Sequence, residues 1–242
     1  MNTRGAPECI ETEIYQDEWI NSNYRTGVGG SYNIDPVESY RDFAVYYIRE
    51  LVRNGADGIY FDDTFLIGSK DLVTGDSYLK KDGRIQPHVG LFHMRELFKQ
   101  TATMLYEEGK CSLDERPFLI AHMTNANIIP IMSFATIGLD WEMRYGSDDV
   151  QDRFSDGFIK AETLGTQAGI VPFVLMRITG PEITRVTRTF LSTILAYDIP
   201  IVMKNNIDDI LFNRIKTLIM KFGYGEEDVQ VCLLYTSPSP RD

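Results

Sequence analysis

Short apolar segments alternate with amphipathic helical segments along most of this chain, and that alternation restricts the fold more than any other feature. The apolar segments begin at Gly58, Phe118, Thr136, Ile170 and Ile199. Helical material follows each of them, and strands and helices that alternate in this way form a parallel sheet with helices packed against it. The sequence therefore predicts the α/β class.

The clearest unit is Asn54–Phe65, which reads NGADGIYFDDTF. Gly55 is placed to end a helix, and Gly58–Phe61 has the aromatic and β-branched residues of a buried strand. Two carboxylates, Asp62 and Asp63, follow directly. In parallel α/β folds the chemistry lies at the carboxyl ends of the strands, so these acids are the first candidates for a functional site.

More narrowly, the order of elements predicts part of a (β/α)8 TIM barrel. A whole barrel takes about 250 residues, so about five βα units fit strands 4–8 of a barrel truncated at both ends. A doubly wound open sheet is the alternative, but no Gly-rich phosphate loop follows any strand. The expected domains are an upstream loop or partial βα unit over 1–34, a partial catalytic barrel over 35–231, and a tail over 232–242.

The tail, Cys232–Asp242, reads CLLYTSPSPRD and resembles the translation of a sequencing-library adapter. A segment of that origin does not belong in fold reasoning. We therefore expect the gene to continue past about Gln230, and the tail to be exposed and without regular structure. The alternative is a natural Pro/Ser-rich terminus.

Helix signals surround the predicted strands. Asp35-Pro36-Val37-Glu38 has the pattern of an N-cap, a proline at the first helical position and a capping-box acid. Val45, Ile48, Leu51 and Val52 then recur at helical spacing. Further helices are expected over 89–108, 147–165 (capped by Ser147), 181–197 and 206–222 (capped by Asn206), with a short helix or turn over 128–134. Strands are expected over 58–61, 118–121, 136–139, 170–176 and 199–203. Residues 66–87 form a long excursion, in which Thr74-Gly75 and Asp82-Gly83 indicate a hairpin.

Composition narrows the function classes. The formal charge of −11 argues against a nucleic-acid partner, and no apolar run is long enough for a membrane span. Cys9, Cys111 and Cys232 lack metal or disulfide spacing, and with three histidines no metal centre or cofactor is expected. These features fit a protein that acts on a neutral ligand. The compartment stays open, because a signal for an extracellular or periplasmic location would precede this chain.

Polar residues follow four of the predicted strands and are expected to meet at one mouth of the sheet. They are Asp62 and Asp63, His122 and Asn125, Asp140 and Glu142, and Lys204 and Asn205. Because side chains alternate along a strand, Asp140 and Glu142 should share one face, with Leu139 and Trp141 on the helical side. Asp62 and Asp63 should face opposite ways unless the strand end bends.

Such a group suits cleavage of a glycosidic bond, in which one carboxylic acid protonates the leaving oxygen and a second group stabilises or attacks the sugar cation. The catalytic candidates are Asp62, Asp63 and Glu142. The candidates for substrate binding are Tyr60, His122, Asn125, Asp140, Trp141, Tyr145, Lys204 and Asn205, because aromatic rings stack on sugars and polar groups bind hydroxyls. The plainer interpretation is that a strand-end aspartate caps the next helix and that Trp141 belongs to the core.

Four segments together resemble the catalytic barrel of family 123 glycoside hydrolases. They read DGIYFDDT, HMTNANIIPIMSF, IGLDWEMRYG and RFSDGFIKAETLGTQAGIVPFVL, and the resemblance runs from about Asp35 to Asn213. It implies an exo-acting β-N-acetylgalactosaminidase with flanking β-sandwich domains, in which the 2-acetamido oxygen of the sugar attacks C1. It also implies that Asp62 orients the acetamide and that Asp63 is the general acid/base. The family pair is Asp-Glu, whereas this chain has Asp-Asp, and Glu142 is the alternative carrier of one role.

Three hypotheses follow from the sequence. The first is a retaining glycoside hydrolase that acts on a carbohydrate substrate together with the rest of its barrel. The second is a carbohydrate-binding barrel without catalysis. The third is a divalent-metal hydrolase built on the acidic residues, which the scarcity of histidine disfavours.

Overall fold

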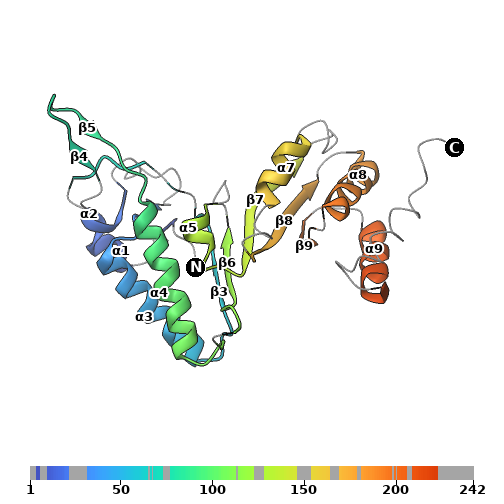
Figure 1. Cartoon of the computed structure of the whole chain (residues 1–242), viewed down its shortest axis with the longest axis horizontal. Coiled ribbons are helices and arrows are strands. Elements are labelled where there is room, and N and C mark those ends of the chain that lie inside the picture. The colour runs from blue at the N-terminus through green and yellow to red at the C-terminus, as the bar shows by residue number, and fades with distance from the viewer. Residues whose placement is uncertain are drawn as a thin grey trace. The chain divides into compact units, whose positions relative to one another are not determined.

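A computed structural model gives the structure of the chain (Figure 1). It describes residues 4–5, 10–21, 32–64, 66, 68–72, 77–112, 114–122, 128–145, 154–163, 169–178, 181–197, 199, 201–205 and 209–222, without the side chains of residues 4–5, 32–33, 140–145, 176–178, 194, 201–205, 219–220 and 222. The chain folds as two compact units. The first comprises Met1–Asp140 with Gln167–Ile170, and the second comprises Trp141–Thr166 with Val171–Asp242.

The first unit contains a parallel arrangement of strands, as the sequence predicts. Strands β3 (Ile59–Phe61), β6 (Leu119–His122) and β7 (Ile137–Tyr145) are hydrogen-bonded in that order, and both pairings are parallel. Helix α4 (Leu91–Glu107) lies between β3 and β6 in the chain, and α5 (Ile129–Met132) lies between β6 and β7. The α/β class is therefore confirmed.

The segment before α3 holds more regular structure than the loop we expect from its sequence. Strand β1 (Arg4–Gly5) pairs antiparallel with β2 (Tyr32–Asn33), and helices α1 (Ile10–Ile14) and α2 (Gln16–Trp19) lie between them in the chain. Trp19 is buried, stacks on Tyr15 and meets the edge of Tyr40 on α3. Burial of this large ring attaches α2 to the main body of the unit.

Helix α3 (Glu38–Arg53) begins later than the sequence predicts. Its N-cap is Val37, which makes no capping hydrogen bond through its side chain, and Pro36 lies before the helix. The carboxylate of Asp35 is instead buried and lies 3.1 Å from Nδ1 of His93 on α4. The predicted capping box is therefore wrong, because a partner distant in sequence binds the Asp35 side chain.

The C-terminal end of α3 agrees with the sequence. Gly55 has a φ of +110°, which favours glycine over every other residue. Its N–H donates to the carbonyl of Val52, and the N–H of Ala56 donates to the carbonyl of Leu51. This is the Schellman arrangement, which satisfies the last carbonyls of a helix and turns the chain into the next strand.

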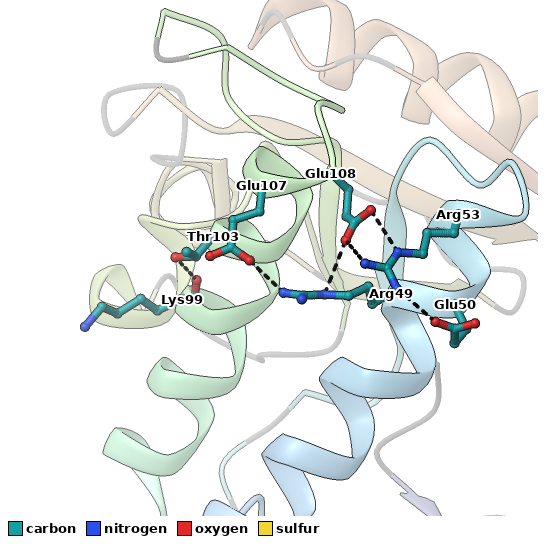
Figure 2. A network of polar contacts seen from close by, with 7 residues as sticks. All are labelled: Arg49, Glu50, Arg53, Lys99, Thr103, Glu107 and Glu108. Atoms are coloured by element: carbon teal, nitrogen blue, oxygen red, sulfur yellow. Dashed lines mark hydrogen bonds and ion pairs between the residues drawn. The ribbon is translucent and has the colours of Figure 1, made fainter.

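Helices α3 and α4 lie side by side (Figure 1) and are joined near their C-terminal ends by ion pairs (Figure 2). Arg49 reaches Glu107 at 2.6 Å, and the Arg53 guanidinium lies 3.0 Å from Glu108. Hydrogen bonding to Glu108 raises the pKa of Arg53 above its ordinary value. Exposed pairs of this kind stabilise a fold only slightly, so the packed faces of the two helices determine their arrangement.

Strands β4 (Tyr78–Leu79) and β5 (Ile85–Gln86) form the hairpin that Asp82-Gly83 predicts. Gly83 has a φ of +78°, which the turn requires of it. Ser69 and His88 form an antiparallel bridge at the base of the hairpin. Thr74-Gly75, the other predicted turn, lies outside the described residues.

In the second unit, β8 (Val171–Ile178) pairs in parallel with β9 (Ile201–Asn205). Its helices are α7 (Asp156–Thr163), α8 (Ile183–Ala196) and α9 (Asp209–Phe222). Helix α8 begins two residues after the predicted start, because Pro181 and Glu182 form a turn. The core of this unit is apolar and consists of Ile159, Val174, Val186, Phe190, Leu191 and Ile199.

Several predictions on this part of the chain fall outside the described residues. They concern the caps Ser147 and Asn206 and the tail Cys232–Asp242. Within the described part of the chain, no helix has the length and apolar character to cross a membrane.

Candidate functional site

The pairing of β3 with β6 positions the candidate site. In the parallel register Tyr60 lies opposite Ile120 and Phe61 opposite Ala121, so Asp62 comes next to His122. Phe61 is buried and packs on Phe98 of α4, which identifies the helical side of the strand. Because side chains alternate, Tyr60 and Asp62 share the other side.

Asp62, His122 and Tyr60 form one hydrogen-bonded cluster. Nδ1 of His122 lies 2.6 Å from Oδ1 of Asp62, and the Tyr60 hydroxyl donates to the same oxygen at 3.2 Å. The Tyr60 hydroxyl also contacts Nδ1 of His122 directly. The side chain of His122 is 4% exposed, whereas that of Asp62 is 33% exposed. A buried base is thus hydrogen-bonded to a carboxylate that reaches solvent.

Asp63 follows at a sharp bend of the chain. Its φ of +55° lies in the left-handed region, and no other non-glycine residue in the described part of the chain has a positive φ. The N–H of Asp63 donates to Oδ1 of Asp62 at 3.1 Å. Such a conformation costs an L-residue about 1–2 kcal/mol, although aspartate tolerates it better than most. The strand end therefore bends, and the simple rule that neighbouring side chains face opposite ways does not apply to this pair.

Thr64 fixes the chain beyond the bend. Its N–H and its hydroxyl both donate to the carbonyl oxygen of His122, at 2.8 and 2.6 Å. The residue is fully buried. Sequence reasoning missed Thr64, because a threonine after two acids carries no signal that it binds a strand about sixty residues away.

The residue of β7 that lies next to His122 is Leu139 and not one of the acids. The register pairs His122 with Leu139 and Ala121 with Gly138, and Leu139 is buried. At Gly138 a Cβ would lie 2.5 Å from the terminal methyl group of Met132 on α5, so this position faces α5. The prediction that Leu139 faces the helical layer is therefore wrong, and the register places it on the side of Tyr60 and Asp62.

The side chains of the other candidates lie outside the described part of the chain. Asp140, Trp141, Glu142 and Tyr145 lie within β7, which continues beyond the predicted strand end, and their side chains are outside the described part. Lys204 and Asn205 are the last residues of β9, again without described side chains, and Asn125 lies outside the described residues. The described site thus consists of Tyr60, Asp62, Asp63 and His122.

The cluster can hold one carboxylate in a fixed position next to a second. Among the described residues no group of three or more His, Cys, Asp and Glu side chains is arranged to hold a metal ion.

Burial raises the pKa of the Glu162 carboxyl on α7 and of the Cys111 thiol, and neither group belongs to the cluster. Adjacent acids in different environments are the arrangement that acid/base chemistry uses.

Comparison with other proteins gives no match, either to a protein-family model or to a curated protein. The site must therefore be interpreted from its own geometry.

Proposed function

We propose that this chain is the catalytic part of a retaining glycoside hydrolase that acts on a 2-acetamido sugar. The observation that supports this proposal is the cluster of Asp62, Tyr60 and His122 beside Asp63, at the carboxyl end of a parallel strand. This is where α/β enzymes place catalytic groups. Adjacent parallel strands that follow chain order in the first unit also fit the proposed partial (β/α)8 barrel.

In this proposal the two acids have different roles. Asp62, held by its neighbours, accepts the acetamide N–H of the substrate and aims the acetamide oxygen at C1. That oxygen forms a bond to C1 while the bond from C1 to the leaving oxygen breaks, and Asp63 gives its proton to the leaving oxygen. Water then attacks C1 as the bond from C1 to the acetamide oxygen breaks, and Asp63 takes a proton from that water. The two displacements together retain the configuration at C1.

The test is hydrolysis of nitrophenyl β-glycosides of N-acetylgalactosamine and N-acetylglucosamine by the full-length protein. The matched control substrate is the nitrophenyl β-galactoside, which lacks the acetamido group. We expect turnover of an acetamido sugar alone, unaffected by a chelator. Binding of the acetamido sugar without turnover would instead support the non-catalytic barrel, and loss of turnover with chelator would support a metal hydrolase.

The first prediction concerns the proton donor. Asp63→Asn should lower kcat about 10²–10⁴-fold, because the amide keeps the shape but cannot donate the proton. Asp62→Asn should also lower kcat, since it weakens the hold on the acetamide. Glu142→Gln is the deciding control, measured on the same substrate. If Glu142→Gln abolishes turnover while Asp63→Asn keeps it, the proton donor lies on β7.

A further inference from the structure

Two side chains of the cluster direct their polar atoms at a protein carboxylate. The Tyr60 hydroxyl and Nδ1 of His122 both lie against Oδ1 of Asp62. The rings of Tyr60 and His122 also pack together, with centroids 5.6 Å apart. His122 is buried under the strand end, and Thr64 binds its backbone carbonyl from the next turn of chain. The side chains of Tyr60 and His122 therefore contact each other as well as Asp62.

The contacts of Nδ1 of His122 allow two arrangements of the protons. Oδ1 of Asp62 accepts from the Tyr60 hydroxyl and from the Asp63 N–H, and Nδ1 of His122 lies against both Oδ1 of Asp62 and the Tyr60 hydroxyl. The imidazole can donate there only if Nδ1 carries its proton. With the proton on Nε2, Nδ1 would instead accept from the Tyr60 hydroxyl.

We infer that Nδ1 of His122 carries its proton and donates to Asp62, and that Tyr60 and His122 are positioning residues, which hold Asp62 correctly aimed and so leave Asp63 to carry the transferable proton. This inference rests on the proposed function for its catalytic consequence. It also changes the expected role of both residues, because they act on the sugar through Asp62 and not by touching it. A positioning role predicts an effect on kcat, since a misaimed carboxylate binds the substrate but fails to align its acetamide.

Three variants separate positioning from substrate binding. His122→Leu removes the donor, His122→Asn keeps an amide N–H near the position of Nδ1, and Tyr60→Phe removes one hydroxyl with little change in packing. We expect His122→Leu to lower kcat about 10–100-fold, the usual effect of a group that orients a catalytic ligand. The KM of His122→Leu should change less than about threefold. His122→Asn should recover part of the kcat that His122→Leu loses, and Tyr60→Phe should lose less kcat than His122→Leu.

The matched control is His93→Leu in the same unit. It removes another hydrogen bond between a histidine and a buried aspartate, the 3.1 Å contact of His93 with Asp35. This variant should lose thermal stability and keep its kcat. A rise in KM at unchanged kcat for His122→Leu would show that His122 binds the sugar. If His93→Leu lowers kcat as much as His122→Leu does, the loss of kcat reflects general destabilisation and not positioning of Asp62.

A second measurement tests the geometry without turnover. Nitrogen NMR of the imidazole should show the proton of neutral His122 on Nδ1, and Asp62→Ala should return the ring to the Nε2–H form that free imidazoles prefer. This result is expected even if no glycoside is hydrolysed, so failure of the proposed function and failure of this inference are distinguishable. An unprotonated Nδ1 in the wild-type protein overturns the inference.

Discussion

At the scale of the residue, Asp63 occupies a backbone position that glycine would occupy more easily. Its φ of +55° turns the chain sharply at the end of β3 and brings its N–H to the carboxylate of Asp62. A left-handed backbone conformation at a residue with a Cβ costs free energy, and it persists only where the surrounding structure holds the backbone in that conformation. The proposed proton transfer gives a reason for an acid at this position.

The strain at Asp63 can be measured through stability. Asp63→Gly should be more stable than Asp63→Ala by about 1 kcal/mol, because glycine adopts positive φ freely and alanine does not. Urea unfolding of both variants gives the difference, and neither should hydrolyse the acetamido substrate. Equal stability of the two variants, or a more stable alanine variant, would contradict a left-handed residue at this bend.

The residues of the site show which of its features can be predicted from the sequence. Asp62 and Asp63 could be recognised because strand-like residues precede them and parallel folds carry chemistry at strand ends. The contact of Asp62 with His122 could not, because it depends on the register of β3 against β6, which hydrophobic patterning leaves open. Leu139 shows the same limit, since alternation gives the relative orientation of neighbours and not which side faces the helices.

At the scale of the element, helix ends were predicted where the signal is local. Gly55 closes α3 by its own backbone conformation and by hydrogen bonds within two turns of the helix. The predicted start of the same helix is wrong, because the Asp35 side chain binds His93 and does not cap the first turn. Local signals fail where a distant partner takes the side chain that would have made the cap.

The buried and exposed faces of α3 can be distinguished residue by residue. Ile48 is 1% exposed and continues the buried stripe of Tyr40, Ala44 and Val52, whereas Leu51 is 58% exposed. Helical spacing alone groups Leu51 with Val45, Ile48 and Val52. The buried stripe instead repeats every four residues, which places Leu51 on the outer surface.

We expect Ile48→Ala to lower the free energy of unfolding by about 2–5 kcal/mol, the usual result of a large-to-small change in a packed core. Leu51→Ala should change it by less than about 0.5 kcal/mol, as surface substitutions do. Chemical denaturation of the two variants measures both values. A large loss for Leu51→Ala would mean that another surface covers this side of α3.

At the scale of the whole molecule, the described part of the chain has two hydrophobic cores. The first contains residues of α3, α4, β3 and β6, among them Ile48, Phe61, Phe98 and Leu119. The second contains residues of α7, β8 and α8, with Phe190 fully buried within it. The division was not predicted, because regular alternation of strands and helices reads as one continuous domain. Strand β7 begins in the first unit and continues into the second.

Two cores within one chain predict that parts of the molecule open separately. Phe190→Ala removes a fully buried ring and should destabilise its own core by about 3–5 kcal/mol. Because cooperative opening units tend to follow such cores, amide hydrogen exchange should accelerate in α7, β8 and α8. Exchange in α3, α4 and β3 should stay at the wild-type rate. The reciprocal variant, Ile48→Ala, should give the reverse pattern. Equal acceleration in both units for either variant would show that the chain unfolds as one cooperative body.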